Sequence, residues 1–79
     1  MSRRIFILGL RAGSLEKAHE VTRRVTAAIE NVQLPVRLIK TTRAGCVVVE
    51  ADEALEGIVQ RQYPELFIEE MRRFNPAED

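Results

Sequence analysis

An unbroken apolar run near the amino terminus, within IFILGL, most restricts what this chain can fold into. Ile5, Phe6, Ile7 and Leu8 are β-branched or bulky and follow one another without a polar residue. That pattern is typical of a β-strand that is buried on both faces. We therefore predict a strand here, and we expect other segments to pack against both of its faces.

The same stretch has a second interpretation, as an export signal. SRRIF before an aliphatic run resembles the twin-arginine pattern, Ser-Arg-Arg-x-Phe. Such a signal needs a longer apolar region and a small-residue cleavage site, whereas Arg11 ends this run and a charged segment follows. The single cysteine, Cys46, fits a reducing compartment, and no stretch approaches the roughly 20 apolar residues of a membrane span. We therefore favour the strand and expect a cytoplasmic protein with no membrane partner.

Hydrophobic spacing predicts a helix and a hairpin after this strand. Ser14 is a suitable N-cap for a helix to about Val32, along which apolar residues recur at helical spacing. Two β-rich runs, 36–41 and 46–51, follow and predict a β-hairpin. The turn between them, 42–45, ends in a glycine, which suits positive φ.

The last third of the sequence predicts a helix that is interrupted and continues as a second segment. Asp52 is a plausible N-cap, and Pro64 interrupts the helix and is expected to start a second segment. The inner side of that second segment is predicted to consist of Leu66, Phe67, Ile68, Met71 and Phe74. The tail, 76–79, is expected to be frayed.

This order, β-α-β-β-α, predicts a single α+β domain over residues 1–79. We expect the split β-α-β arrangement of the ferredoxin-like fold, with the third strand between the first two. Its fourth strand is predicted to be missing, because nothing strand-like follows Phe74. A three-stranded sheet would leave the first strand at an edge and one apolar face without helices.

An apolar edge and an uncovered apolar face both promote association. A chain of 79 residues also has a small core, which oligomerisation often supplements. We therefore expect a homodimer or larger homo-oligomer, formed by edge pairing or by sheet stacking. The alternative is that the broken second helix covers the open face. The residues expected to take part in self-association are Ile5, Phe6, Ile7, Leu8, Leu10, Val47 and Val49.

One end of this sheet is a candidate anion site. Arg-Ala-Gly occurs at 11–13 and at 43–45, and parallel first and second strands would bring both copies to the start of the first helix. Free amides there, together with arginine, suit a carboxylate or phosphate. The candidates are Arg11, Gly13, Ser14, Lys40, Arg43 and Gly45. The alternative is two ordinary surface turns, since the pattern matches neither a Walker A loop nor the dinucleotide-binding GxGxxG.

The charges divide unequally along the chain. Residues 1–43 carry nine basic and three acidic side chains, and residues 44–79 carry three and nine, so the halves have net charges of +6 and −6. Such asymmetry indicates either an interaction surface or two faces that attract each other within the fold.

No catalytic or metal-binding constellation is apparent. His19 has no second ligand at metal spacing, and Cys46 begins an apolar strand. We therefore expect a non-enzymatic, self-associating regulatory or ligand-binding module without a cofactor or metal. A second hypothesis is a protein-interaction adaptor that uses the acidic half, including Glu65, Glu69 and Glu70. A third is nucleic-acid binding through Arg3, Arg4, Arg23, Arg24, Arg37 and Arg43, although the sheet offers few aromatic residues for base stacking.

Overall fold

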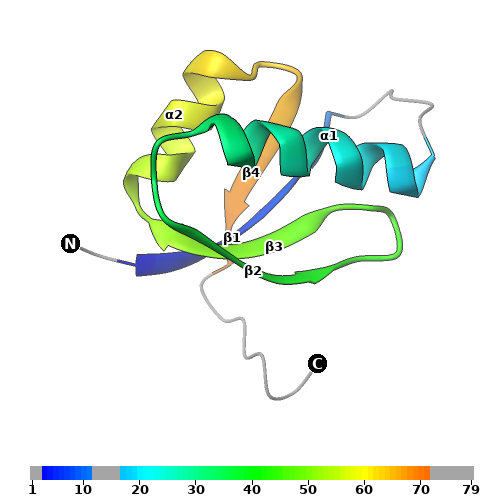
Figure 1. Ribbon diagram of the computed structural model, residues 1–79, viewed down its shortest axis with the longest axis horizontal. Coiled ribbons are helices and arrows are strands. Elements are labelled where there is room, and N and C mark those ends of the chain that lie inside the picture. Colours follow the sequence, from blue (N-terminus) through cyan, green and yellow to red (C-terminus); the bar gives the residue numbers. More distant parts are fainter. Residues whose placement is uncertain (1–2, 12–16, 72–79) are drawn as a thin grey trace.

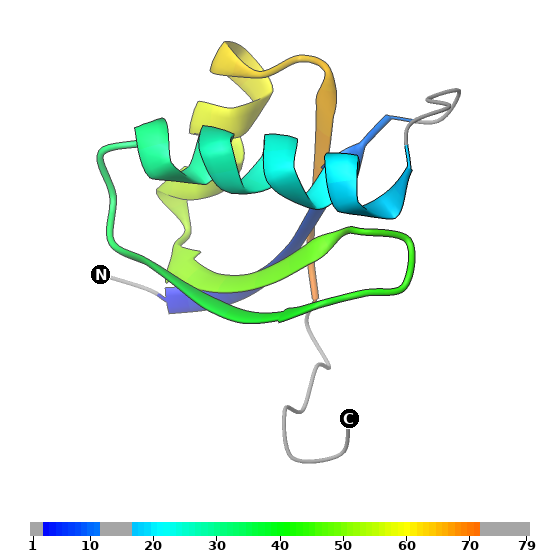
Figure 2. The same cartoon turned by 45° about the vertical axis from the view of Figure 1, so that its right-hand side comes forward.

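Four strands and two helices make up the described part of the chain, which is residues 3–11 and 17–71 of the computed structural model. In chain order they are β1 (Arg3–Leu10), α1 (Ala18–Asn31), β2 (Val36–Thr41), β3 (Val47–Asp52), α2 (Ala54–Gln62) and β4 (Leu66–Glu70). The strands form one antiparallel sheet in the order β2-β3-β1-β4. Both helices lie on the same side of it (Figures 1 and 2). The fold is therefore α+β with two layers.

The predicted first strand lies in the interior of the sheet. β1 pairs with β3 from Arg3 opposite Asp52 to Leu8 opposite Val47. Its other edge pairs with β4, up to Leu10 opposite Leu66. The prediction of a strand over this run is confirmed, but its expected place at the edge is wrong. Association by edge pairing of β1 is excluded, because both of its edges are already used.

The prediction that the fourth strand is missing is wrong, because residues 66–70 form β4. α2 ends at Gln62, and Pro64 lies in the connection to β4 instead of starting a further helix. Within β4, buried Leu66 and Ile68 alternate with more exposed neighbours, a period of two. The free edge of β1 offers this segment a ladder of backbone hydrogen bonds, and pairing there prevails over local helix propensity. The expected position of Phe74 on a helix lies outside the described residues.

The remaining elements agree with the predictions to within a few residues. α1 begins at Ala18, and the proposed cap at Ser14 lies outside the described residues. The predicted hairpin is confirmed as β2 and β3. At the start of α2 the N-cap position is Glu53, but the carboxylate of Asp52 still accepts a hydrogen bond from the amide of Ala54 at 2.9 Å.

The core lies between the helices and one face of the sheet. Alternation along β1 sends Phe6 and Leu8 toward the helices, where both are at most 1% exposed. The helix-side core consists of Phe6, Leu8, Val21, Val25, Ala28, Ile29, Val32, Val47, Val49, Ala51, Leu55, Val59, Leu66 and Ile68. The buried positions of α1 recur three or four residues apart, as an amphipathic helix requires.

An ion-pair cluster joins β1 to β4 at one end of this layer. Nη1 of Arg4 donates to both carboxylate oxygens of Glu70, at 2.9 and 3.1 Å, and Nη2 lies 3.3 Å from a carboxylate oxygen of Glu53. The hydrogen bond and charge of Glu70 raise the pKa of Arg4, opposed by partial desolvation. Glu70 therefore has a structural partner within the fold.

The two faces of β1 should respond differently to truncation. Leu8→Ala removes a side chain with no exposed surface, and we expect the free energy of unfolding to fall by about 3 kcal/mol. Ile7→Ala, on the other face and only partly buried, should cost about 1 kcal/mol. Urea denaturation at low protein concentration measures both. Equal losses would contradict the assignment of these residues to opposite faces.

Candidate functional site

The end of β1 and the turn after β2 lie at the same end of the sheet. This follows because β1 and β2 each pair antiparallel with β3. The turn is closed by hydrogen bonds from the amide of Thr42 to the carbonyl of Cys46, 2.8 Å, and from the amide of Gly45 to the carbonyl of Thr42, 3.0 Å. Gly45 has φ of 90° and is buried against α1, where a Cβ would overlap the carbonyl oxygen of Ala18. The hydroxyl of Thr22 donates to the Gly45 carbonyl at 2.7 Å, so this turn is fixed to the start of α1.

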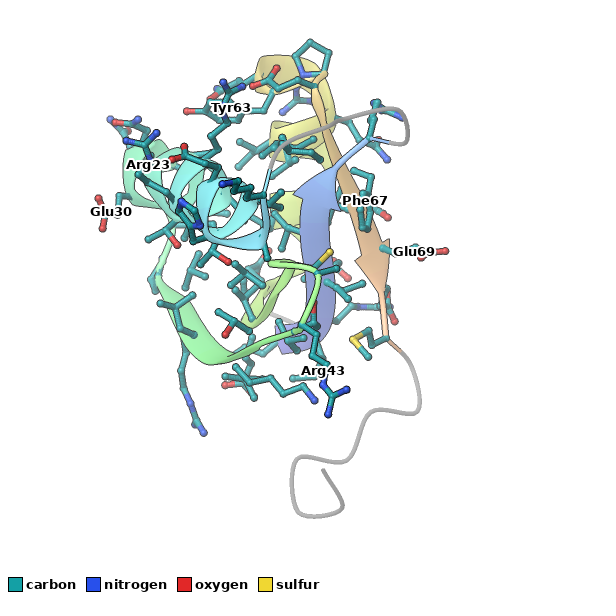
Figure 3. All side chains as sticks on the ribbon, turned by 90° about the vertical axis from the view of Figure 1, so that its right-hand side faces the viewer. Arg23, Glu30, Arg43, Tyr63, Phe67 and Glu69 are labelled. Carbon is teal, nitrogen blue, oxygen red and sulfur yellow. The ribbon has the colours of Figure 1, made fainter. Side chains whose placement is uncertain are left out.

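The candidate anion-binding residues are distributed over several places at this end. Arg11 turns toward the α2–β4 connection, where its Nε donates to the carbonyl of Pro64 at 2.6 Å. Arg43 is exposed in the β2–β3 turn (Figure 3). Lys40 lies within β2, opposite Val48. Gly13 and Ser14 lie outside the described residues. Binding of an anion here stays a prediction.

The face of the sheet away from the helices carries an apolar patch, which we call the open sheet face. By alternation along the strands it comprises Ile5, Ile7, Cys46, Val48, Phe67 and Met71. Val48 is 1% exposed yet lies outside the helix-side core, and the others are partly exposed. Figure 3 shows Phe67 on the side of β4 away from α1, together with Glu69.

Only two of the predicted self-association residues lie on this face. They are Ile5 and Ile7. The structure places Phe6, Leu8, Val47 and Val49 in the helix-side core, and Leu10 packs against it. Sequence reasoning missed Phe67, because its segment was read as a helix, although the period of two in β4 was the signal available.

Phe67 and Cys46 meet over the backbone of Gly9. A Cβ at Gly9 would lie 2.6 Å from Sγ of Cys46 and 2.7 Å from the ring of Phe67, both below normal contact distance. The missing side chain therefore lets an aromatic ring from the edge strand β4 lie across the central strand β1. An aromatic side chain thus reaches this face from β4, whereas Phe6 of β1 is buried on the helix side.

A β-bulge in β2 decides which charges reach the open sheet face. Leu38 pairs with Val49, but Lys40 pairs with the next residue, Val48, which leaves Ile39 as an extra residue. Lys40 consequently shares a face with Val48, and Arg37 shares it as well, through its pairing with Glu50. Simple alternation would have put Arg37 and Lys40 on opposite faces.

One row of residues crosses this face through all the described strands. Lys40 lies opposite Val48, Val48 opposite Ile7, and Ile7 opposite Glu69. The row therefore reads cation, apolar, apolar, anion from β2 to β4. With strands about 4.8 Å apart, the charged ends are separated by about 14 Å of apolar surface.

A second charged group lies next to this row, in which two arginines share one carboxylate and leave a net charge of +1. The carboxylate of Glu50 is 3.5 Å from Nε of Arg3 and 3.9 Å from Nη1 of Arg37. All three side chains are partly exposed, so each pair contributes less than about 1 kcal/mol. Their main effect is to offset the charge of Glu50 beside the apolar patch.

Other kinds of site find little support in the described part of the chain. No three His, Cys, Asp or Glu side chains of those residues gather as metal ligands. None of the helices described is both long and apolar enough to cross a membrane. Two features call for a functional explanation, the open sheet face and the end of the sheet that carries the β2–β3 turn, which we call the turn end.

The Gly45 turn gives a direct test of how this end is built. Gly45→Ala adds a Cβ at positive φ and against a backbone carbonyl, so we expect the free energy of unfolding to fall by more than about 1 kcal/mol. Gly57→Ala in α2 is the matched control, since its Cβ would meet only the end of the Arg61 side chain, at 4.0 Å. That control should gain about 0.5–1 kcal/mol from helix propensity. Chemical denaturation measures both, and a neutral Gly45→Ala would contradict the packing of the turn on α1.

Comparison with known proteins provides no functional assignment for this chain. No protein-family model, no curated protein and no solved structure matched the chain. The function therefore has to be argued from the open sheet face and the turn end.

Proposed function

We propose that this chain is a non-enzymatic binding module that associates with itself through the open sheet face. The observation that carries the proposal is the apolar patch of Ile5, Ile7 and Phe67, which are partly exposed on the face that neither helix covers. In antiparallel sheets with one solvated face, the outward positions are usually polar. A contiguous apolar patch with charged residues around it is typical of a contact surface.

Sheet stacking is the mode of association that we propose. Edge pairing through β1 is unavailable, because β3 and β4 occupy both edges. Two stacked sheets lie about 10 Å apart with their side chains interdigitated. A second core of this kind would also stabilise a chain whose own core is small.

The order of the elements supports a ferredoxin-like description for this fold. The chain runs β-α-β-β-α-β, and the sheet order is β2-β3-β1-β4. We extend the proposal by analogy to a regulatory or ligand-binding role, with an anion held near Arg43 at the turn end. The single cysteine supports a cytoplasmic location.

Two other functions receive less support from the contacts. An adaptor that bound its partner through the acidic half would have less use of Glu70, because the carboxylate of this residue already accepts hydrogen bonds from Arg4. A nucleic-acid surface would need free cations, but Arg23 pairs with Glu20, and Arg3 and Arg37 pair with Glu50. Nucleic-acid binding would show affinity that falls steeply with salt concentration.

Solution mass tests the proposal most directly. We expect a dimer or larger species by sedimentation equilibrium across a dilution series. Ile7→Lys, on the open sheet face, should give a folded monomer, because it places a charge within the apolar contact. Leu38→Lys is the matched control, since Leu38 lies on the same sheet but faces the other way and is 55% exposed. Leu8 is unsuitable for this test, because a lysine in its fully buried place would unfold the chain.

Two results would contradict self-association. One is a native chain that stays a monomer at every concentration. The other is an equal effect of Ile7→Lys and Leu38→Lys, which would mean that the open sheet face has no special part in assembly.

The anion hypothesis has a separate test. At equal ionic strength, phosphate in place of chloride should raise the melting temperature by several degrees, because a ligand that binds only the folded chain stabilises it. Arg43→Ala should remove most of that increase. Arg61→Ala, at an exposed position of α2, is the control and should keep the increase. Differential scanning calorimetry measures the shift. Identical shifts in the two variants would contradict a site at the turn end.

A further inference from the structure

We infer that the outer edge of β4 binds an extended segment of a partner protein, which joins the sheet as an additional strand and carries a lysine or arginine opposite Glu69. β4 lies at the border of the sheet, so only one of its edges pairs with another described strand, β1 (Figure 3). This interaction uses the border of the sheet and does not depend on the self-association proposed for the open sheet face.

The backbone hydrogen bonds show which groups of β4 point outward. The amide of Arg11 donates to the carbonyl of Glu65 at 3.1 Å, and the amide of Met71 donates to the carbonyl of Ile5 at 2.8 Å. Bonding alternates between successive residues of an antiparallel ladder, so the odd-numbered residues of β4 direct their N–H and C=O groups to β1. The N–H and C=O of Ile68 therefore point away from β1, and within the described ranges they have no hydrogen-bond partner.

The two borders of the sheet differ in how well they could accept another strand. β2 has a β-bulge at Ile39, which interrupts the regular spacing of its backbone groups. Bulges, prolines and lysines are the usual means by which proteins prevent pairing at an edge. β4 keeps a regular register with β1 over its full length, and its sequence, LFIEE, contains neither proline nor lysine. β4 is therefore the edge that is suited to pairing.

The side chains of β4 select the kind of strand that would pair with it. Phe67 and Glu69 lie on the side of β4 away from α1 (Figure 3). Glu69 is exposed and forms no ion pair with any residue that the structure describes, whereas Glu70 accepts hydrogen bonds from Arg4. Residues directly opposite each other on neighbouring strands interact. An antiparallel partner segment should therefore carry a basic residue opposite Glu69 and, two positions later, an apolar residue opposite Phe67.

A second copy of this chain fits the edge less well. Pairing between two β4 strands through the outward groups of Ile68 would put Glu69 opposite Glu65, Phe67 or Glu69 of the other copy, depending on the register. None of these three residues is a cation, and two of them repel a carboxylate. The charge of the edge therefore favours a basic segment from a different protein.

The first experiment tests the backbone pairing with a fluorescein-labelled heptapeptide, Thr-Val-Lys-Val-Leu-Val-Thr, whose binding is measured by fluorescence anisotropy. With its lysine opposite Glu69, the amide of its central valine faces Ile68. Methylation of that nitrogen should weaken binding by about tenfold or more, because it removes a hydrogen bond at the edge. Methylation of the leucine nitrogen, which faces away from β4, is the matched control and should leave the affinity unchanged. Equal effects of the two methyl groups, or no binding of the unmethylated peptide at millimolar concentration, would overturn the inference.

The second experiment reverses the charge of the edge. Glu69→Lys should raise the dissociation constant of the lysine peptide about tenfold at low salt, because an attractive cross-strand pair becomes a repulsive one. A peptide with glutamate in place of the lysine should prefer the variant to the native chain. Glu30→Lys, at an exposed position of α1, makes the same change of net charge and should alter neither affinity. Equal effects of the two substitutions would indicate a general effect of net charge and would overturn the assignment to β4.

Amide hydrogen exchange identifies the occupant of the edge. In the dilute native chain, the amide of Ile68 should exchange faster than those of Phe67 and Glu69, which face β1. Saturating lysine peptide should slow the exchange of Ile68 by about tenfold or more. Protection of Ile68 in the dilute chain without peptide would show that another segment of the same chain occupies the edge. Protection that increases with protein concentration would show that a second copy does, and either result would overturn the inference.

Discussion

The pairing of β1 along both of its edges is the constraint on which the rest of this structure depends. β1 is the strand to which β3 and β4 are both hydrogen-bonded, and its side chains contribute to both faces of the sheet. Phe6 and Leu8 form the centre of the helix-side core, while Ile5 and Ile7 form the centre of the open sheet face. One short apolar run therefore stabilises the fold and also supplies the surface that we propose for assembly.

Much of this fold could be predicted from local sequence patterns. The run in β1, the apolar stripe of α1 and the glycine at the end of the hairpin turn each indicate a single conformation. β4 could not be assigned in that way, because LFIEE, followed by Met71, also fits an amphipathic helix. What decides between them is the free edge of β1, and an edge is a property of the assembled sheet and not of the segment itself.

The candidate site was predictable to a smaller extent. Ile5 and Ile7 are predicted from their position in an apolar strand. The same prediction includes Phe6 and Leu8, which belong to the core. Which of the two alternating sets faces solvent depends on where the helices lie, and the strand sequence does not show this. Phe67 and Glu69 reach the open sheet face only because β4 exists. The position of Lys40 depends on a bulge, which a sequence pattern of alternating residues does not reveal.

Because of the bulge, β2 can become one residue shorter without reversing the direction of its later side chains. Removing one residue from a regular strand turns every later side chain to the opposite face, so strands generally tolerate no change of length. Ile39 is an exception, because it has no partner residue in the ladder with β3. A chain shortened by that one residue would keep Leu38 toward the helices and Lys40 on the other face. Within the described sheet, the bulge in β2 is thus a place where one residue can be lost without altering the surface that the strand presents.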